Sequence, residues 1–432
     1  MRILSLALLF PAATKAFRQH LTNSPRSRRS IASASCSSSS PSHSHSALNS
    51  SSSSSLGEDI QSTTTAATMD SDSKKYRLLD GENSTGGIGK LADDYDVFLL
   101  DMWGVMHDGI KPYEGVPEVV RELRAAGKKL IILSNSSKRR SNSVEMLGKL
   151  GFSPEDDFSE IITSGEVAHH LLRYLSRADG GGDEKSSWVP REIPEAFSAL
   201  RDANKEGLLS AYCFGSGDGD EDYLESCGWN LAESIETADL IVARGTFVVL
   251  SATDCADKKR DEEAYWAAYK DVLERASRLP NPPPMVVCNP DKVRPDADKS
   301  PMPGTIGVAY QELLEANRDD AMENDDRILS LGKPFSGVYD IALSSIIGSD
   351  DRSRVVMVGD ALETDVTGAT AAGIDSIWVV NDGIHNQEID DAASTLEGGC
   401  EVVLEGFNAR SEGTYARGLQ VSPTVVIPHL RW

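Results

Sequence analysis

Residues 96–105 constrain the fold of this chain more than any other stretch. Residues 97–100 form a short unbroken apolar run that ends abruptly in Asp101, with Gly104 close behind. Such a run is typical of a strand that is buried on both faces of a parallel sheet. Asp101 then lies at the carboxyl end of a strand, where open α/β sheets bind their ligands. The sequence therefore predicts a parallel α/β fold with an acidic side chain at its functional edge.

A second strand of this kind is predicted at residues 129–133, after a helix with apolar spacing at 115–126. A strand–helix–strand unit crosses over right-handed in nearly all folds, so its two strands lie parallel. Ser134 and Asn135 follow the second strand and are therefore expected at the same edge as Asp101. The predicted fold class is accordingly α/β, with helices covering a parallel sheet.

Two later apolar runs, residues 327–331 and 354–358, also end in polar residues. Lys333 follows the first, and Asp360 with Asp365 follows the second. If all four strands belong to one sheet, carboxylates, a hydroxyl and an ammonium meet around one point. Clustered carboxylates stay ionised where cations hold them, and oxygen donors without His or Cys indicate Mg²⁺. Such a site could bind a phosphoryl group, with a carboxylate attacking in line.

The amino-acid composition of the chain changes near residues 180–182, which are three consecutive glycines that begin a polar run. Strands and helices continue to alternate beyond them, which predicts a second α/β module over residues 180–300. The predicted core domain then consists of residues 76–179 and 301–432. Residues 1–75 are predicted to be a targeting presequence or a disordered segment.

The first 57 residues carry six basic residues and no acidic residue. An apolar start followed by an Arg- and Ser-rich tract resembles the two-part plastid presequences of algae with secondary plastids. This composition favours a plastid over a mitochondrion as the destination. A mitochondrial presequence and plain disorder are left open, and with plain disorder the chain is expected in the cytoplasm.

The 432-residue chain has a formal net charge of −24 at pH 7, which argues against some partners. So acidic a protein repels phosphate backbones, and nucleic acid is not expected as a partner. The sequence has no apolar run of ~18 residues, so no membrane span is expected. The six cysteines show neither zinc-site nor disulfide spacing. The oligomeric state is left open, a homodimer included.

Taken in order, these strand ends resemble the four motifs of the haloacid dehalogenase superfamily. The match consists of a strand then Asp101, a strand then Ser134, Lys333 within Gly-Lys-Pro, and Asp360 with Asp365 five positions on. The resemblance covers the chain from about residue 96 to its end. It implies a three-layer Rossmann-like core, and the long interval between Ser134 and Lys333 implies an inserted α/β cap domain.

The run Asn289-Pro-Asp291 is similar to the nitrophenylphosphatase and pyridoxal phosphatase branch of that superfamily, called class IIA. The similarity implies that Asn289 and Asp291 contribute to the substrate or phosphate site. An ordinary Asx-Pro turn is the alternative for both residues. The run Asp-x-Trp-Gly-Val at residues 101–105 is most similar to an uncharacterised subgroup of the same branch.

The resemblance also implies a chemical role for each motif. Asp101 would be the nucleophile that forms an aspartyl-phosphate, and Lys333 would neutralise charge on nucleophile and phosphate. Ser134, helped by the main chain of Asn135, would bind a phosphoryl oxygen of a small phosphorylated metabolite. The implied Mg²⁺ ligands are Asp101, the main-chain carbonyl of Trp103, Asp360 and Asp365, the last as a ligand or a support.

One position departs from the family pattern, because phosphatases of this type carry a second Asp two residues after the nucleophile. This chain has Trp103 there, and an indole cannot exchange a proton at neutral pH. Losing a positioned acid or base costs ~10²–10⁴ in rate. His107 could replace the acid or be a turn residue that is only solvated. A phosphatase is therefore the first hypothesis, a phosphometabolite-binding or regulatory protein the second, and a transferase on the same scaffold the third.

Overall fold

The computed structural model describes residues 76–79, 87–177, 185–204, 209–217, 219–294, 300–317, 327–346, 352–410, 415–416 and 418–432. These residues belong to one compact unit, Lys74–Trp432. The predicted presequence at residues 1–75 lies outside the described residues, so it and the plastid destination stay predictions. Among the helices that are described, none is long and apolar enough to cross a bilayer.

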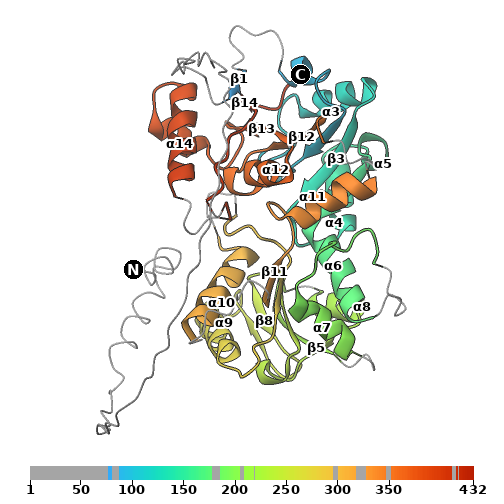
Figure 1. Ribbon diagram of the computed structural model, residues 1–432, viewed down its shortest axis with the longest axis vertical. Coiled ribbons are helices and arrows are strands. Elements are labelled where there is room, and N and C mark those ends of the chain that lie inside the picture. The colour runs from blue at the N-terminus through green and yellow to red at the C-terminus, as the bar shows by residue number, and fades with distance from the viewer. Residues whose placement is uncertain are drawn as a thin grey trace, which may run out of the picture. The chain divides into compact units, whose positions relative to one another are not determined.

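The core sheet is parallel throughout, in the strand order β1-β14-β13-β12-β2-β3-β4. Figure 1 shows the first and last of these strands in sequence, blue β1 and red β14, side by side. Alternate side chains of β2 pack into two different hydrophobic clusters, Leu99 into one and Phe98 into the other. The predicted parallel sheet, buried on both faces, is thereby confirmed. Its strands are β1 (Arg77–Leu78), β2 (Val97–Leu100), β3 (Lys129–Ser134), β4 (Glu160–Thr163), β12 (Val355–Gly359), β13 (Asp375–Val379) and β14 (Val425–Ile427).

A second sheet is formed by the middle of the chain, in the order β11-β10-β7-β5-β8-β9 with β6 beside β5. Its pairs are parallel except those that involve β8, which are antiparallel. The expected second α/β module is thus present. Its strands are β5 (Ser210–Gly215), β6 (Asn230–Leu231), β7 (Leu240–Ala243), β8 (Val248–Leu250), β9 (Cys255–Asp257), β10 (Met285–Val287) and β11 (Ile328–Ser330).

One strand lies in a different sheet from the one predicted. β11, which leads to Lys333, was expected in the core sheet, but it pairs with β10 at the edge of the second sheet. Apolar content cannot distinguish the two sheets, since both bury strands of the same kind. The second sheet therefore runs past residue 300, while the predicted domain limits themselves stay predictions.

Helices surround both sheets and connect successive strands. They are α3 (Val116–Ala125), α4 (Arg140–Lys149), α5 (Pro154–Asp157), α6 (Ser164–Leu175), α7 (Glu195–Ala203), α8 (Asp220–Ser226), α9 (Glu262–Ser277), α10 (Pro303–Asn317), α11 (Ser336–Asp340), α12 (Thr367–Ala372), α13 (Asn386–Ala392) and α14 (Leu396–Ala409). Shorter turns are the 3₁₀ segments η1 (Ile88–Leu91) and η2 (Ile235–Thr237) and the π-helical segments η4 (Ile341–Ile346) and η5 (Leu362–Val366).

Helix α6 joins the core to the second module. Its apolar side chains lie in one hydrophobic cluster that also holds Leu99 of the core sheet and Val242 of the second sheet. Polar contacts reinforce this packing: the indole N–H of Trp229 donates to the carbonyl of Leu172 at 2.9 Å. His169 Nε2 lies 3.1 Å from Ser226 Oγ at the end of α8. The two modules therefore share a continuous apolar core.

His169 makes this junction sensitive to acid. Burial, aided by the charge of Arg139, lowers the pKa of His169 from 6.5 to about 4. The unfolded chain therefore takes up a proton below about pH 6.5 while the folded chain resists until about pH 4, so stability falls as the pH drops through that window. We expect His169→Gln, which cannot titrate, to lose less stability than the wild type between pH 6.5 and pH 4 in urea unfolding. Parallel pH profiles for the two proteins would contradict this.

Candidate active site

Two carboxylates are brought together by neighbouring strands of the core sheet. Asp101 follows β2 and Asp360 follows β12, and these strands pair in parallel with Val358 opposite Leu100. Asp365 lies on the segment after Asp360, and one carboxylate oxygen from each Asp lies within 4.8 Å of the others. The expected convergence of three acidic side chains at the carboxyl edge is therefore observed.

Lys333 completes the cluster although it arrives from the other sheet. Its Nζ lies 2.6 Å from Asp101 Oδ1 and 2.7 Å from Asp365 Oδ1. Only 2% of the lysine side chain is exposed, against 15% for Asp101. The ammonium is thus buried between two carboxylates, while the Asp101 side chain is partly exposed.

The charges in this cluster do not balance, because three carboxylates face one ammonium. Burial raises the pKa of Asp101 to about 7, with Lys333 opposing the rise and Asp365 adding to it. Burial, with Asp365 and Asp101, also raises the pKa of Asp360 well above its usual value. Burial alone would lower the pKa of Lys333, but Asp101 and Asp365 raise it instead. Another positive charge is what would keep these acids ionised.

These residues fit a magnesium ion. The donors are carboxylate oxygens, the ligands that Mg²⁺ prefers, and a divalent cation would neutralise the surplus negative charge. Asp101 and Asp360 are the candidates for direct contact. Asp365 fits the role of a support, since its Oδ2 accepts hydrogen bonds from the main-chain N–H groups of Asp360 and Ala361 at 3.1 and 3.0 Å.

Close backbone approach holds Asp360 in place. Gly104 has a φ of +80°, and a Cβ there would lie 2.2 Å from Asp360 Oδ2. Only glycine tolerates that conformation and that contact together. On the other side, the main-chain N–H of Ile384 donates to Asp360 Oδ2 at 2.8 Å. The indole N–H of Trp378 donates to the Asp360 carbonyl at 2.9 Å.

Ser134 and Asn135 lie at the end of β3, beside the strand that carries Asp101. Both are nearly buried, and Ser134 Oγ accepts the main-chain N–H of Ser136 at 3.3 Å. This placement is compatible with a phosphoryl oxygen bound by Ser134 and the main chain of Asn135, and that role stays a prediction. The amide side chain of Asn135 is occupied instead by Asp291 and by the main chain of Lys333.

Asn289 and Asp291 also reach this edge, from the loop after β10. Asn289 Oδ1 accepts the main-chain N–H of Asp291 at 2.8 Å, which is the Asx turn that was the alternative for this run. Burial raises the pKa of Asp291 to about 6, partly offset by its hydrogen bond from Asn135. Their expected contact with substrate stays a prediction.

Trp103 packs against its own loop. Its ring meets the imidazole of His107 edge-on, with centroids 5.8 Å apart, and a Cβ at Gly109 would lie 2.6 Å from the indole. His107 is fully buried, and its Nδ1 accepts the main-chain N–H of Gly109 at 2.9 Å. Burial lowers the pKa of His107, so the imidazole is neutral near pH 7. His107 therefore shapes the loop, and the exposed-turn reading of it is wrong.

Sequence reasoning missed the residues that support the site from further along the chain. Ile384 and Trp378 contact Asp360, and a Cβ added at Gly383 would lie 2.4 Å from Asp360 Cβ. The turn after β13 was visible in the sequence as Asn-Asp-Gly, but nothing local connects it with Asp360. Knowing that β13 pairs with β12 would have supplied that connection.

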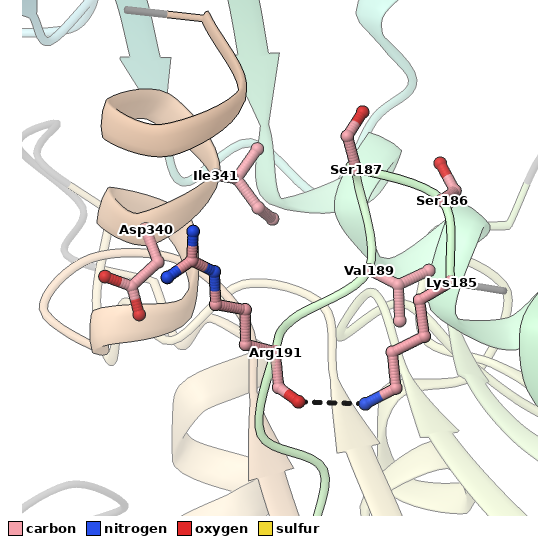
Figure 2. Close-up of a pocket in the computed structure, with 7 residues that line it drawn as sticks. All are labelled: Lys185, Ser186, Ser187, Val189, Arg191, Asp340 and Ile341. Atoms are coloured by element: carbon pink, nitrogen blue, oxygen red, sulfur yellow. Dashed lines mark hydrogen bonds between the residues drawn. The ribbon is translucent and has the colours of Figure 1, made fainter. Parts of the chain in front are cut away.

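A pocket is found away from this cluster, between the segment before α7 and helix α11 (Figure 2). Lys185 there donates to the main-chain oxygen of Arg191 at 2.8 Å, the bond drawn as a dashed line. Residues with polar or charged side chains dominate the lining, and no predicted site residue belongs to it. The lining residues are Lys185, Ser186, Ser187, Val189, Arg191, Asp340 and Ile341.

Comparison with known proteins agrees with this geometry. Two family models match: a haloacid dehalogenase-like hydrolase over residues 98–181, and a HAD-like hydrolase over residues 330–397. The human protein chronophin is 24% identical over 324 residues, which cover 74% of this chain and 92% of chronophin. The 4-nitrophenylphosphatase of Schizosaccharomyces pombe is 24% identical over 301 residues, which cover 69% of this chain and 88% of that enzyme.

A solved structure supports the fold. It is described as a possible sugar phosphatase of the same superfamily from Cytophaga hutchinsonii, with a TM-score of 0.51 and 18% identity, covering 80% of this chain and 98% of that one. Together with the four motifs, the two family models and the two curated relatives identify the family. The chain belongs to the haloacid dehalogenase-like superfamily and, within it, to class IIA.

Proposed function

We propose that this chain is a Mg²⁺-dependent phosphatase that acts on a small phosphorylated metabolite through an aspartyl-phosphate on Asp101. The general activity in this proposal, hydrolysis of a phosphoric ester by an enzyme of the haloacid dehalogenase type, rests on named relatives that are phosphatases. The observation that supports the dependence on Mg²⁺ and the aspartyl-phosphate is the cluster of three carboxylates and one ammonium. Lys333 Nζ touches Asp101 and Asp365, and Asp360 lies within 4.8 Å of both acids.

The residues support a two-step reaction. An oxygen of Asp101 attacks phosphorus, the bond between phosphorus and the leaving oxygen breaks, and Lys333 offsets charge on the phosphoryl group. A water molecule then attacks the aspartyl-phosphate, which releases inorganic phosphate and restores the carboxylate. Mg²⁺, when bound by Asp101 and Asp360, would supply charge neutralisation and orientation of the phosphoryl oxygens.

Magnesium removal tests this proposal. We expect phosphate release from a panel of aryl and alkyl phosphate esters to require Mg²⁺, to stop on chelation by EDTA and to return when Mg²⁺ is added back. The panel is assayed with the purified chain by measurement of inorganic phosphate. Release that EDTA leaves unchanged would reject the metal, and no release from any ester would reject the phosphatase.

Trp103 supports a second candidate function. Where related phosphatases carry a general acid, this chain has an indole packed on His107 and Gly109, and its N–H cannot cycle a proton. A phosphometabolite-binding or regulatory protein with little turnover would keep the cation site and tolerate this change. Tight binding of a phosphorylated metabolite without Mg²⁺-dependent release would favour this alternative.

A further inference from the structure

Lys333 and its carboxylate partners are carried by different sheets. β11, which leads to Lys333, pairs with β10 at the edge of the second sheet, whereas Asp101 and Asp360 follow strands of the core sheet. No pairing between β11 and a described strand of the core sheet sets the distance between Lys333 Nζ and Asp101. Other contacts must therefore fix the lysine against the core.

One amide side chain makes that connection. Asn135 Oδ1 accepts the main-chain N–H of Lys333 at 2.7 Å, and its Nδ2 donates to the Lys333 carbonyl at 2.9 Å. Asn135 stands in the loop after β3 of the core sheet and is only 5% exposed. A single core side chain thus satisfies both main-chain polar groups of Lys333.

Asp291 accepts a hydrogen bond from the same amide. Asn135 Nδ2 also donates to Asp291 Oδ1 at 2.8 Å, and the Ser164 hydroxyl donates to Asn135 Oδ1 at 3.4 Å, so both partners favour the amide orientation in which Nδ2 faces the Lys333 carbonyl. The segments that carry Lys333, Asn135 and Asp291 are closely packed. A Cβ at Gly332 would lie 2.5 Å from Asn135 Oδ1 and 2.9 Å from Pro290 Cδ, which leaves the lysine loop no room to shift toward them.

The loop that carries Asp291 is itself anchored to the core. Lys292 Nζ lies 2.6 Å from Glu363 Oε1, on the segment that follows Asp360. The Tyr415 hydroxyl donates to the carbonyl of Pro290 at 2.6 Å, and Lys292 Nζ lies 4.5 Å from the centre of the Tyr415 ring. Asp291 is therefore held at a defined position relative to both sheets.

We propose that Asp291 is a positioning residue that acts through Asn135 to hold the Lys333 main chain, and thereby keeps the ammonium between Asp101 and Asp365. Asp291 accepts a hydrogen bond from the Asn135 amide, so its carboxylate is already engaged in holding that side chain. The inference rests on the proposed function for its catalytic consequence. This role requires that residue 291 offer a hydrogen-bond acceptor and does not require a negative charge. A carboxyl group keeps an acceptor oxygen even when it is protonated.

Paired substitutions test the role. Asp291→Ala removes the acceptor, and we expect kcat to fall by about 10²-fold, the cost of a 1 Å misplacement of a reacting group. Asp291→Asn keeps an acceptor oxygen and is expected to stay within about threefold of the wild type. Asp239→Ala is the control, since Asp239 also accepts a hydrogen bond, in its case from the main-chain N–H of Ser210 in the second sheet at 2.9 Å. It should leave kcat unchanged.

Three outcomes of these kinetic measurements would each overturn the proposal. If Asp291→Ala keeps wild-type kcat, Asp291 positions nothing. If Asp291→Asn falls as far as Asp291→Ala, the charge or the proton of Asp291 matters instead of its acceptor. Asp291→Ala combined with Asn135→Ala should be no slower than Asn135→Ala alone, because both changes break one connection. Additive losses would contradict that connection.

A binding measurement separates this inference from the proposed function. Inorganic phosphate binding in the presence of Mg²⁺, measured by calorimetry, requires Lys333 in place but no turnover. If the wild type hydrolyses no ester, the phosphatase proposal fails, yet phosphate affinity lowered by about tenfold or more in Asp291→Ala and preserved in Asp291→Asn would still support positioning. Equal phosphate affinity in all three proteins, or none in the wild type, would reject it.

Discussion

Asp101→Asn is expected to reduce Mg²⁺-dependent phosphate release by at least about 10³-fold. The amide has nearly the shape of the carboxylate but is a poor nucleophile and offers less charge to a cation. Lys333 Nζ would also lose its 2.6 Å contact with a carboxylate. The measurement is kcat on the best ester of the panel at saturating Mg²⁺, with unfolding curves to verify that the variant is folded.

Asp96→Asn provides the matched control for that experiment. Asp96 stands at the amino end of the same strand, exposed and paired with Arg354 at 2.5 Å. Its hydrogen bonds with Arg354 lower the pKa of Asp96 to about 2, so it carries a full charge as the nucleophile must. Unchanged kcat in Asp96→Asn together with loss in Asp101→Asn would locate the chemistry at the carboxyl edge. Substantial activity in Asp101→Asn would exclude an aspartyl-phosphate there.

Trp103→Asp is expected to raise kcat on alkyl phosphate esters by about 10²-fold or more, and to change kcat on aryl esters little. An alkyl leaving group needs a proton as its bond to phosphorus breaks, and the indole cannot supply one. An aryl leaving group departs without this help, so the wild type should already prefer aryl esters. The measurement is the ratio of alkyl to aryl kcat in the two proteins.

Trp103→Asn separates the gain of an acid from the loss of the indole. Both substitutions remove the packing of the indole ring on His107 and Gly109, but only the aspartate can donate a proton and take it up again. We therefore expect Trp103→Asn to resemble the wild type in its alkyl-to-aryl ratio, or to be slower on both. A similar rise in Trp103→Asn would show that the indole merely obstructs the site.

Much of the core site was predictable because it follows from strand ends. An apolar run followed by a polar residue identifies both the strand and the edge at which its last residue lies, so Asp101, Ser134 and Asp360 could be assigned in advance. The family motifs then connected these positions with Mg²⁺ and a phosphoryl group. The structure confirms the convergence of Asp101, Asp360, Asp365 and Lys333.

Other parts of the site depend on contacts between residues far apart in the sequence. His107 looked like a solvated turn residue and is buried, because the loop folds back over it. The expected place of Asn135 and Asp291 near the phosphate stays a prediction, but their side chains also bond to each other, and Asn135 bonds to the Lys333 main chain. Hydrogen-bond partners of this kind are set by the packing of separate segments, which leaves no periodic signal in any one of them.

The class of fold and the residues at the carboxyl ends of the core strands could be predicted from the amino-acid sequence, since each depends on a few consecutive residues. The missing acid at Trp103 was found by comparing one such short run with the family pattern. The folded chain alone shows that Lys333 arrives from the second sheet and that the side chain of Asn135 ties its main chain to the core. The difference arises because a buried strand carries the same apolar pattern in either sheet. Which neighbour it pairs with is decided by packing over the whole chain.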